Sequence, residues 1–316
     1  MVEKIEEFFE GIKDEPRLLM VVELKPLQGE RFQPTGFPDL GPAEYLSPDG
    51  RTMLLVESTQ SMANRLECVC WDDDAEDLIE PLRGLPYIHV DLGDGSYTNS
   101  ILEAHRINSE YIMRNSDFKK KLEAELDTSK EKPINFKNVY RTLLKYDVNS
   151  LIHGTFLEEI DGRIRVPRML SSFIEAYDVN PVMSGGVKFS RVSPQKKEGV
   201  GHVPYSRIEY TAKTIKAFFN IDLAGIRGFG LGEDVERLLV LLSLYKIRKF
   251  LREGLRLRTA CDLKVVGDLR ITCPQKEGLE VPDLKTLEKA LPEIIKECSK
   301  KGYFADPPVT KIKYKD

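Results

Sequence analysis

The sequence predicts an α+β fold, a single domain over residues 1–316 in which a long insertion separates two strands. Three observations support this fold class. Short apolar runs typical of strands are mixed along the chain with amphipathic helical patterns. Residues 233–253 form the clearest helix, with acidic residues at its start and basic residues at its end. Residues 180–207 are rich in Gly, Pro, Ser, Lys and Arg, which predicts a protruding hairpin or loop.

The first third of the chain predicts three strands and two helices. Strands are expected at 17–24, 51–57 and 87–91, separated after the first by a Gly- and Pro-rich loop over 28–41. Ser58 is the predicted N-cap of a helix whose buried face carries Met62, Ala63, Leu66, Val69 and Cys70. Ser100 and Glu103 match a capping box and predict a helix through SILEAHRINSEYIMR.

The remaining elements follow from the same patterns. Residues 115–135 are charged and helix-prone with little apolar period, so they are expected in a peripheral insertion, and 136–146 predict an amphipathic helix. Strands are expected at 149–157 and 163–176, and paired strands at 255–271. A last helix is expected around 284–298, before a lysine-rich end.

Composition and charge narrow the class of protein. No apolar run approaches the roughly 18 residues that a membrane span needs, and the N-terminus lacks the features of a signal peptide. Five scattered cysteines indicate reduced thiols and a cytoplasmic location. The formal net charge of -4 argues against nucleic acid, but the distribution is uneven, with an acidic run at 72–80 and basic regions at 163–207 and 246–270. The acidic run is either a stacking surface for another copy or a solvated turn.

Four groups of polar and basic residues are candidates for binding nucleic acid. The loop 28–41 and the helix after Ser58 combine amides, cations and a helix N-terminus, which suit phosphates and bases. Basic residues interleaved with aromatics at 184–207 suit a single strand. Surface ion pairs, a rigid connector or an ordinary solvent face are the structural alternatives. The candidates are Gln28, Arg31, Gln33, Gln60, Ser61, Asn64, Arg65, Arg163, Arg165, Arg168, Lys188, Phe189, Arg191, Lys196, Lys197, His202, Arg207, Arg256 and Arg258.

Other chemistry receives little support from the sequence. Gly228, Gly230 and Gly232 mimic a dinucleotide-binding turn, but the spacing G-x-G-x-G favours a tight turn that caps a helix. The four histidines lie far apart and no zinc spacing exists, so we expect no metal, no cofactor and no catalytic residue. The aromatic signature of RRM domains is also missing, which puts base stacking on a sheet face in doubt.

Several segments, in one order along the chain, resemble the backbone subunit of CRISPR Cascade effector complexes in the RAMP superfamily. The similarity runs from about Leu18 to about Leu263, and the closest subgroup is type I-G, formerly I-U. The segments are QGERFQPTGFPDLG, MLLVESTQSMANRLE, NSLIHGTFL, VPRMLSSFIEAYDV, SGGVKFSRV, EGVGHVPYSRIEYTA and GLRLRTACDL. The resemblance implies an RRM-like (ferredoxin-like) palm, a helical fingers-like insertion expected at 95–147, and a hairpin thumb at 180–207.

The resemblance also implies a function and partners. We expect a non-catalytic scaffold whose copies assemble head to tail along CRISPR RNA and present it to target DNA. The implied protein partners are the type I-G large subunit, the guide-capping and processing subunit, and a recruited helicase-nuclease. Type III relatives place a cleaving carboxylate in a loop comparable to that of Asp39, so a RAMP-type endoribonuclease is the alternative.

Overall fold

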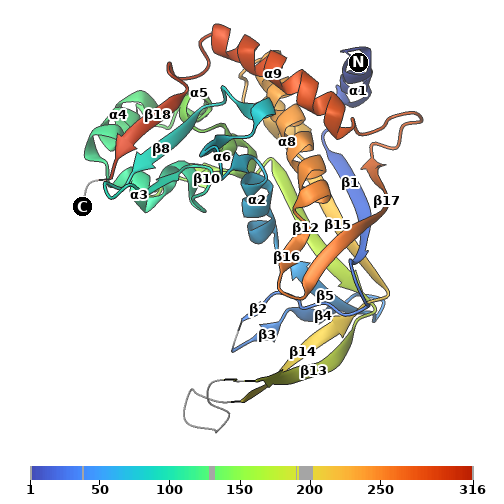
Figure 1. Cartoon of the computed structure of the whole chain (residues 1–316). Helices are drawn as coiled ribbons and strands as arrows, with labels where there is room; N and C mark the ends of the chain where they lie inside the picture. Colours follow the sequence, from blue (N-terminus) through green and yellow to red (C-terminus); the bar gives the residue numbers. More distant parts are fainter. Residues whose placement is uncertain (1, 38, 128–131, 190, 192–201, 315–316) are drawn as a thin grey trace.

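The centre of the molecule is a seven-stranded antiparallel sheet (Figure 1). The computed structural model describes the whole chain except residues 1, 38, 128–131, 190, 192–201 and 315–316. In spatial order, the strands are β16 (Arg256–Arg258), β17 (Cys261–Cys273), β1 (Leu18–Pro26), β15 (Thr214–Ile221), β12 (Leu170–Tyr177), β5 (Thr52–Glu57) and β4 (Glu44–Leu46).

Four of these strands and two helices reproduce the ferredoxin-like order. Strands β1 and β12 are parallel to each other with β15 inserted between them, and β17 pairs on the other side of β1. Helix α2 (Thr59–Cys68) packs on β12 and helix α8 (Glu233–Glu253) on β15, so both cover the same face of the sheet. This split βαβ arrangement confirms the predicted α+β, RRM-like fold.

Local sequence explains where the core elements begin and which side they bury. Alternate residues of β1, from Leu18 to Leu24, point into the core, as a half-buried strand requires. The side chain of Ser58 accepts a hydrogen bond from the N–H of Ser61 at 3.3 Å, which confirms the predicted cap of α2. Helix α8 follows a turn in which Gly230 and Gly232 have positive φ, so the glycine-rich segment forms a helix-capping turn.

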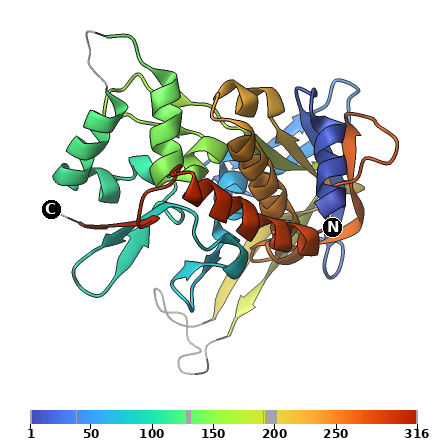
Figure 2. The ribbon, with the colours of Figure 1, turned by 90° about the horizontal axis from the view of Figure 1, so that it is seen from above.

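A large insertion between α2 and β12 contains both helices and strands. Its elements are β6 (Trp71–Asp72), β7 (Asp77–Leu78), η1 (Glu80–Leu82), β8 (Tyr87–Asp91), β9 (Tyr97–Asn99), η2 (Arg106–Asn108), α3 (Glu110–Met113), α4 (Ser116–Leu126), α5 (Phe136–Tyr146), α6 (Val148–His153), β10 (Thr155–Phe156) and β11 (Arg165–Val166). The late strand β18 (Val309–Lys313) joins it by pairing in parallel with β8. Figure 2 shows the insertion and the N-terminal helix α1 (Val2–Ile12) at opposite sides of the molecule.

Two local predictions inside the insertion are wrong. The helix expected from Ser100 is a series of turns followed by η2 and α3, because Glu103 accepts hydrogen bonds from Thr98 and Ser109. The hydroxyl of Ser100 instead accepts from the N–H of Ile88. The strand expected at 149–157 is mostly helix α6, whose Asn149, Ser150 and His153 each contact a buried partner that the sequence pattern does not show.

Those partners form a buried polar network that joins the insertion to the palm. Arg106 donates two hydrogen bonds to the carboxylate of Glu67 on α2, at 2.6 and 2.7 Å. Lys246 on α8 contacts Nε2 of His153 at 2.9 Å and also donates to Asn149. Burial, together with the nearby charges of Lys246, Arg106 and Arg168, lowers the pKa of His153 well below its ordinary value. The folded protein therefore holds this imidazole neutral.

A long hairpin extends the connection between β12 and β15 away from the sheet. Its strands are β13 (Asn180–Lys188) and β14 (Val203–Thr211), and the shorter hairpin of β2 (Gly36–Phe37) and β3 (Gly41–Pro42) lies nearby (Figure 1). Helices α7 (Leu223–Gly228) and α9 (Leu284–Lys300) complete the fold. The hairpin and the insertion give the molecule the outline of a crescent (Figure 1).

The neutral state of His153 predicts a pH dependence of stability. An unfolded chain binds a proton at this histidine near pH 6.5, whereas the folded chain does not until a much lower pH. The free energy of unfolding should therefore fall below pH 6.5, by up to about 1.4 kcal/mol per pH unit from this group. Urea denaturation at pH 7.5, 6.5 and 5.5 measures the slope. His153→Gln should flatten it, and an equal slope in both proteins would contradict a neutral buried His153.

Candidate nucleic-acid interface

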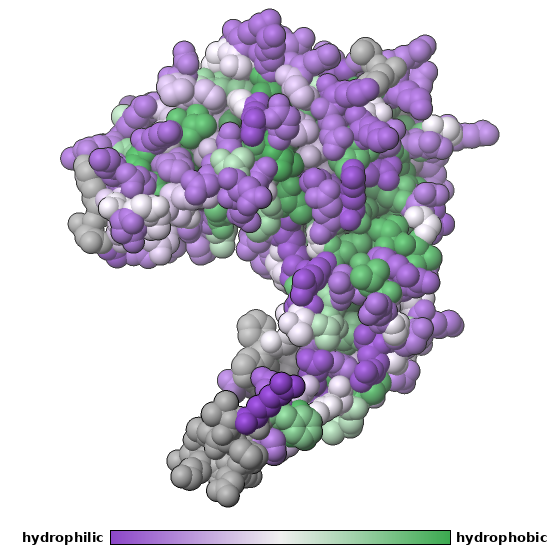
Figure 3. Space-filling model, in the orientation of Figure 1, coloured by the Kyte–Doolittle hydropathy of each residue, from purple (hydrophilic) through white to green (hydrophobic). Residues whose placement is uncertain are grey.

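The inner side of the crescent is hollowed, and we call this hollow the concave face (Figure 3). Helix α2 and strand β16 lie at its base, the hairpins β2–β3 and β13–β14 form one arm, and the insertion forms the other (Figure 1). These elements carry most of the residues that the sequence predicts to bind RNA.

A buried carboxylate at the base of the concave face holds three of the predicted segments together. Glu57, only 1% exposed at the end of β5, accepts hydrogen bonds from Arg65, Arg258 and Ser61. The bond from Arg65 is 3.0 Å long. Because Arg65 is on α2 and Arg258 on β16, this one side chain joins the helix to the far edge strand of the sheet.

Both arginines also bond to backbone carbonyls. Arg65 donates to the carbonyl of Leu257 at 2.6 Å, and Arg258 donates to the carbonyls of Gln33 at 3.1 Å and Val56 at 3.2 Å. Burial lowers the pKa of Arg65 and of Arg258 from the ordinary arginine value. Arginine nonetheless keeps its charge in proteins, so two cations facing one carboxylate leave a local charge of about +1.

The structure therefore divides the predicted residues of α2 and β16 into two roles. Ser61, Arg65 and Arg258 bind Glu57 and build the surface. Gln60, Asn64 and Arg256 are exposed beside them and can contact a ligand.

A second buried carboxylate anchors the loop 28–41 to the long hairpin. Glu209 on β14 is 3% exposed and pairs with Arg31 at 3.1 Å and with Arg207. The backbones of Phe32 and Tyr210 exchange two hydrogen bonds of 2.9 Å. Gln28, Arg31 and Arg207 line a cavity of about 330 Å³ at this junction. The loop is thus held against the long hairpin rather than standing free.

The hairpin has two chemically different faces. Residues paired across the strands point to the same side, so Ser184 and Arg207 share a face with Lys188 and Tyr205. The opposite face is apolar and carries Met183, Val187 and Ile208, which are 78%, 45% and 46% exposed.

The tip of the hairpin adds further predicted residues. Phe189 is 78% exposed and meets the ring of His202 edge-on, with the centroids 5.1 Å apart. Lys188 and Arg191 are exposed, while Lys196 and Lys197 lie outside the described residues. The described part of the hairpin therefore presents both cations and an aromatic ring.

The predicted arginines at 163–168 make contacts within the insertion. Arg163 pairs with Asp161 at 2.7 and 2.8 Å, and Arg168 donates to the carbonyl of His153 at 3.2 Å. The guanidinium of Arg165 lies 4.4 Å from the centroid of the Phe156 ring. Arg163 and Arg165 thus belong to the arm that the insertion forms. The contact of Arg163 with Asp161 agrees with the structural alternative, a surface ion pair.

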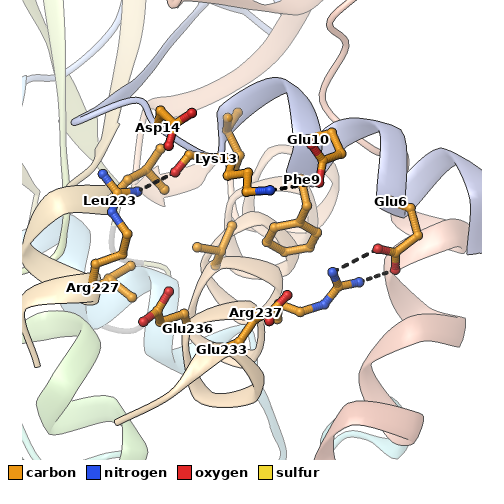
Figure 4. A pocket seen from close by; sticks show the side chains of 13 residues that line it. Glu6, Phe9, Glu10, Lys13, Asp14, Leu223, Arg227, Glu233, Glu236 and Arg237 are labelled. Carbon is orange, nitrogen blue, oxygen red and sulfur yellow. Dashed lines mark hydrogen bonds and ion pairs between the residues drawn. The ribbon is translucent and has the colours of Figure 1, made fainter. Parts of the chain in front are cut away.

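A separate cavity of about 500 Å³ lies between α1, α7 and α8 (Figure 4). Four of its charged groups pair with one another: Arg237 binds Glu6 and covers the ring of Phe9 at 4.4 Å, and Lys13 lies 3.5 Å from Glu10. None of the predicted RNA-binding residues lines it.

The described residues offer little support for a catalytic site, a metal site or a membrane span. Asp39 is exposed in the turn between β2 and β3. Within the described ranges, no cluster of three or more His, Cys, Asp or Glu side chains could hold a metal ion. The same ranges contain no helix with the length and apolar character of a membrane span.

Sequence reasoning missed Glu57 and Glu209. Each glutamate ends or interrupts an apolar strand pattern, in LLVES and RIEY, and such residues usually face solvent. Their partners lie as far away as 201 residues along the chain, so only the fold shows why a charge occupies a buried position.

Three solved structures resemble the chain at low sequence identity. A chain of a "CRISPR RNA-guided surveillance complex, pre-nicking" has a TM-score of 0.42 and 13% identity, with 94% of this chain and 96% of that chain covered. Csc2 of Thermofilum pendens has a TM-score of 0.32 and 11% identity, covering 90% and 77%. A chain of a further "CRISPR RNA-guided surveillance complex" has a TM-score of 0.28 and 13% identity, covering 74% and 71%.

Sequence comparison gives the family. No curated protein matches the chain. Residues 18–181, just over half of the chain, match the family described as CRISPR-associated protein GSU0053. This match starts at the first residue of β1 and continues through α2 and the insertion into β13. The chain therefore belongs to the CRISPR-associated protein family GSU0053.

Proposed function

We propose that this protein is a non-catalytic backbone subunit of a type I-G Cascade complex, which binds CRISPR RNA on its concave face. Its membership of a CRISPR-associated family supports a role in CRISPR defence. The observation that carries the proposal is the meeting of α2, β16, the loop 28–41 and the hairpin through Glu57 and Glu209. Four segments far apart in sequence thereby form one polar surface.

The chemistry of this surface suits an RNA backbone. Exposed Lys188, Arg191 and Arg256 supply cations for phosphates, and Gln60 and Asn64 supply amides for sugars and bases. The N-terminus of α2 adds unpaired N–H groups. Sequence recognition is left to pairing between the guide and the target DNA, while the protein reads backbone and shape.

The proposal includes the partners that the resemblance implies. Copies of the chain stack head to tail along the guide in the cytoplasm. They act with the type I-G large subunit, the guide-capping and processing subunit, and the helicase-nuclease.

The first prediction concerns phosphate contacts. Replacing Lys188, Arg191 and Arg256 together by Gln should weaken binding of CRISPR RNA without regard to its sequence. The slope of log affinity against log salt should become shallower by about 2, because each lost contact to a single strand removes about 0.7. Fluorescence anisotropy between 50 and 300 mM salt measures the slope. Lys285, Lys289 and Lys296, exposed on α9, are the matched control, and equal slopes for both triple variants would contradict the proposed interface.

The second prediction concerns catalysis. The purified protein should leave labelled CRISPR RNA uncut with or without Mg²⁺, because no acid–base or metal set surrounds Asp39 among the residues described. Gel electrophoresis of the RNA gives the readout. Cleavage that requires Mg²⁺ and disappears in Asp39→Ala would establish the ribonuclease alternative instead.

The third prediction concerns assembly, and the structure narrows the residues to change. Asp72 accepts hydrogen bonds from the N–H groups of Asp74 and Ala75, and Asp77 contacts Tyr87 and Arg83, so these two acids shape the β6–β7 hairpin. Asp73, Asp74 and Glu76 are exposed. Reversing these three to Lys should reduce the number of copies bound to a long RNA. The changed surface would be basic, and it would repel the basic surface of the next copy instead of attracting it.

Native mass spectrometry counts the copies on each RNA, and a short RNA that holds one copy tests basal binding. Lys substitutions at the exposed residues Glu277, Glu293 and Glu297 are the charge-matched control. If the acidic-hairpin variant assembles as fully as this control, the acidic run is a solvated turn and another surface carries the stacking.

A further inference from the structure

The face of the sheet opposite α2 and α8, which we call the outer sheet face, carries apolar side chains that do not join the core. On β1, β12 and β15 every second residue points to this face and is half-buried or exposed, and the half-buried ones include Leu19, Val21, Phe173 and Phe218. None of these four belongs to the hydrophobic core or packs against it. Figure 3 shows a hydrophobic area on the flank where β1, β15 and β17 run, on the convex side of the crescent. Exposed apolar areas on a protein surface commonly mark a site that binds a ligand or a partner.

Two aromatic rings stand at the centre of this face. Phe173 on β12 and Phe218 on β15 are register partners on the two strands, and their rings stack with centroids 5.0 Å apart and planes 21° apart. Tyr177 follows on the same face of β12. Lys216 and Arg51 lie 5.3 and 5.7 Å from the centroid of the Tyr177 ring. Both rings are partly exposed on this face, so bases can stack on or against them.

Four cations lie on the same face as these rings. The register places Val21 between Arg270 and Phe218, Lys216 in the next row, and Lys25 beside Lys264 in the row after that. Among the residues that the structure describes, no carboxylate lies within ion-pair distance of these four cations. The carboxylate of Glu175 on this face accepts hydrogen bonds from Tyr45 at 2.6 Å and Tyr177 at 3.2 Å. The register places Glu23 and Glu175 on either side of Lys216, so these four cations share the outer sheet face with two carboxylates and outnumber them.

We propose that the outer sheet face binds single-stranded nucleic acid, at a second site distinct from the concave face. Aromatic rings on the central strands of a ferredoxin-like sheet stack on unpaired bases, and neighbouring cations bind the phosphates. A protein partner would favour a centre depleted in charge, whereas here Lys216 lies between the row of Phe218 and the row of Tyr177, and Arg270 lies beyond Val21 in the row of Phe218. The ligand class is a single nucleic-acid strand with exposed bases.

Binding of a fluorescent twelve-nucleotide oligo(dT) tests the proposal. The background is the full chain with Lys188, Arg191 and Arg256 changed to Gln, so that the concave face contributes little. In this background, Phe173→Leu with Phe218→Leu keeps apolar bulk but removes the ring stack, and Lys216→Gln with Arg270→Gln removes two cations. Each pair should weaken binding about tenfold or more. The leucine pair loses the stacking of rings on bases. The glutamine pair loses two cations that bind phosphates.

Two further readouts make the outcome decisive. Photocrosslinking of 5-iodouracil DNA should label peptides from β12 and β15 in the background protein and not in the leucine pair. Should the leucine pair unfold, which circular dichroism reports, the glutamine pair on the exposed surface still tests the site. Unchanged oligo(dT) affinity in both pairs would overturn the proposal, and a change in self-association alone would assign the face to a protein contact. Failure of the concave-face proposal would appear separately, as normal CRISPR RNA binding by the background protein.

Discussion

The pairing of one buried carboxylate, Glu57, with Arg65 and Arg258 is the interaction on which the concave face depends. Without Glu57, two partly buried guanidinium groups would face each other across α2 and β16 with no opposing charge. Removing one member of a buried ion pair commonly costs about 3–5 kcal/mol. Because the same arginines bind the carbonyls of Gln33 and Leu257, the carboxylate also positions the loop and the edge strand.

A buried polar network holds the arm of the crescent that the insertion forms. Glu67, Arg106, His153 and Lys246 are all nearly inaccessible to solvent, and they join α2, the insertion and α8. Helix α2 therefore makes one buried ion pair in each direction: its Glu67 binds Arg106 of the insertion, while its Arg65 binds Glu57 at the end of β5. The helix that presents Gln60 and Asn64 to the concave face is held at both sides by charged networks. Such a surface changes little when a ligand binds.

Local patterns in the sequence predicted the bounds of individual helices and strands better than they predicted which strands pair and which side chains meet. Helix α8 has the bounds that its charge and periodicity predict, and so do α5 and β8. The ferredoxin-like order came from resemblance, because periodicity carries no information on which strands pair. Helix α6 was missed because Asn149 and His153 look like surface residues until Lys246 is placed beside them. The aromatic pair Phe173 and Phe218 was missed for the same reason, since their register is a property of the sheet.

The central claim is that CRISPR RNA lies on the concave face, and the position of crosslinks on the protein tests it most directly. CRISPR RNA containing 4-thiouridine would be bound by the full chain, irradiated and digested, and the crosslinked peptides identified by mass spectrometry. The account predicts adducts in α2, in β16 and in the hairpin β13–β14, the elements joined through Glu57 and Glu209. Adducts confined to α1, α9 or the outer sheet face, with none on these three elements, would contradict it.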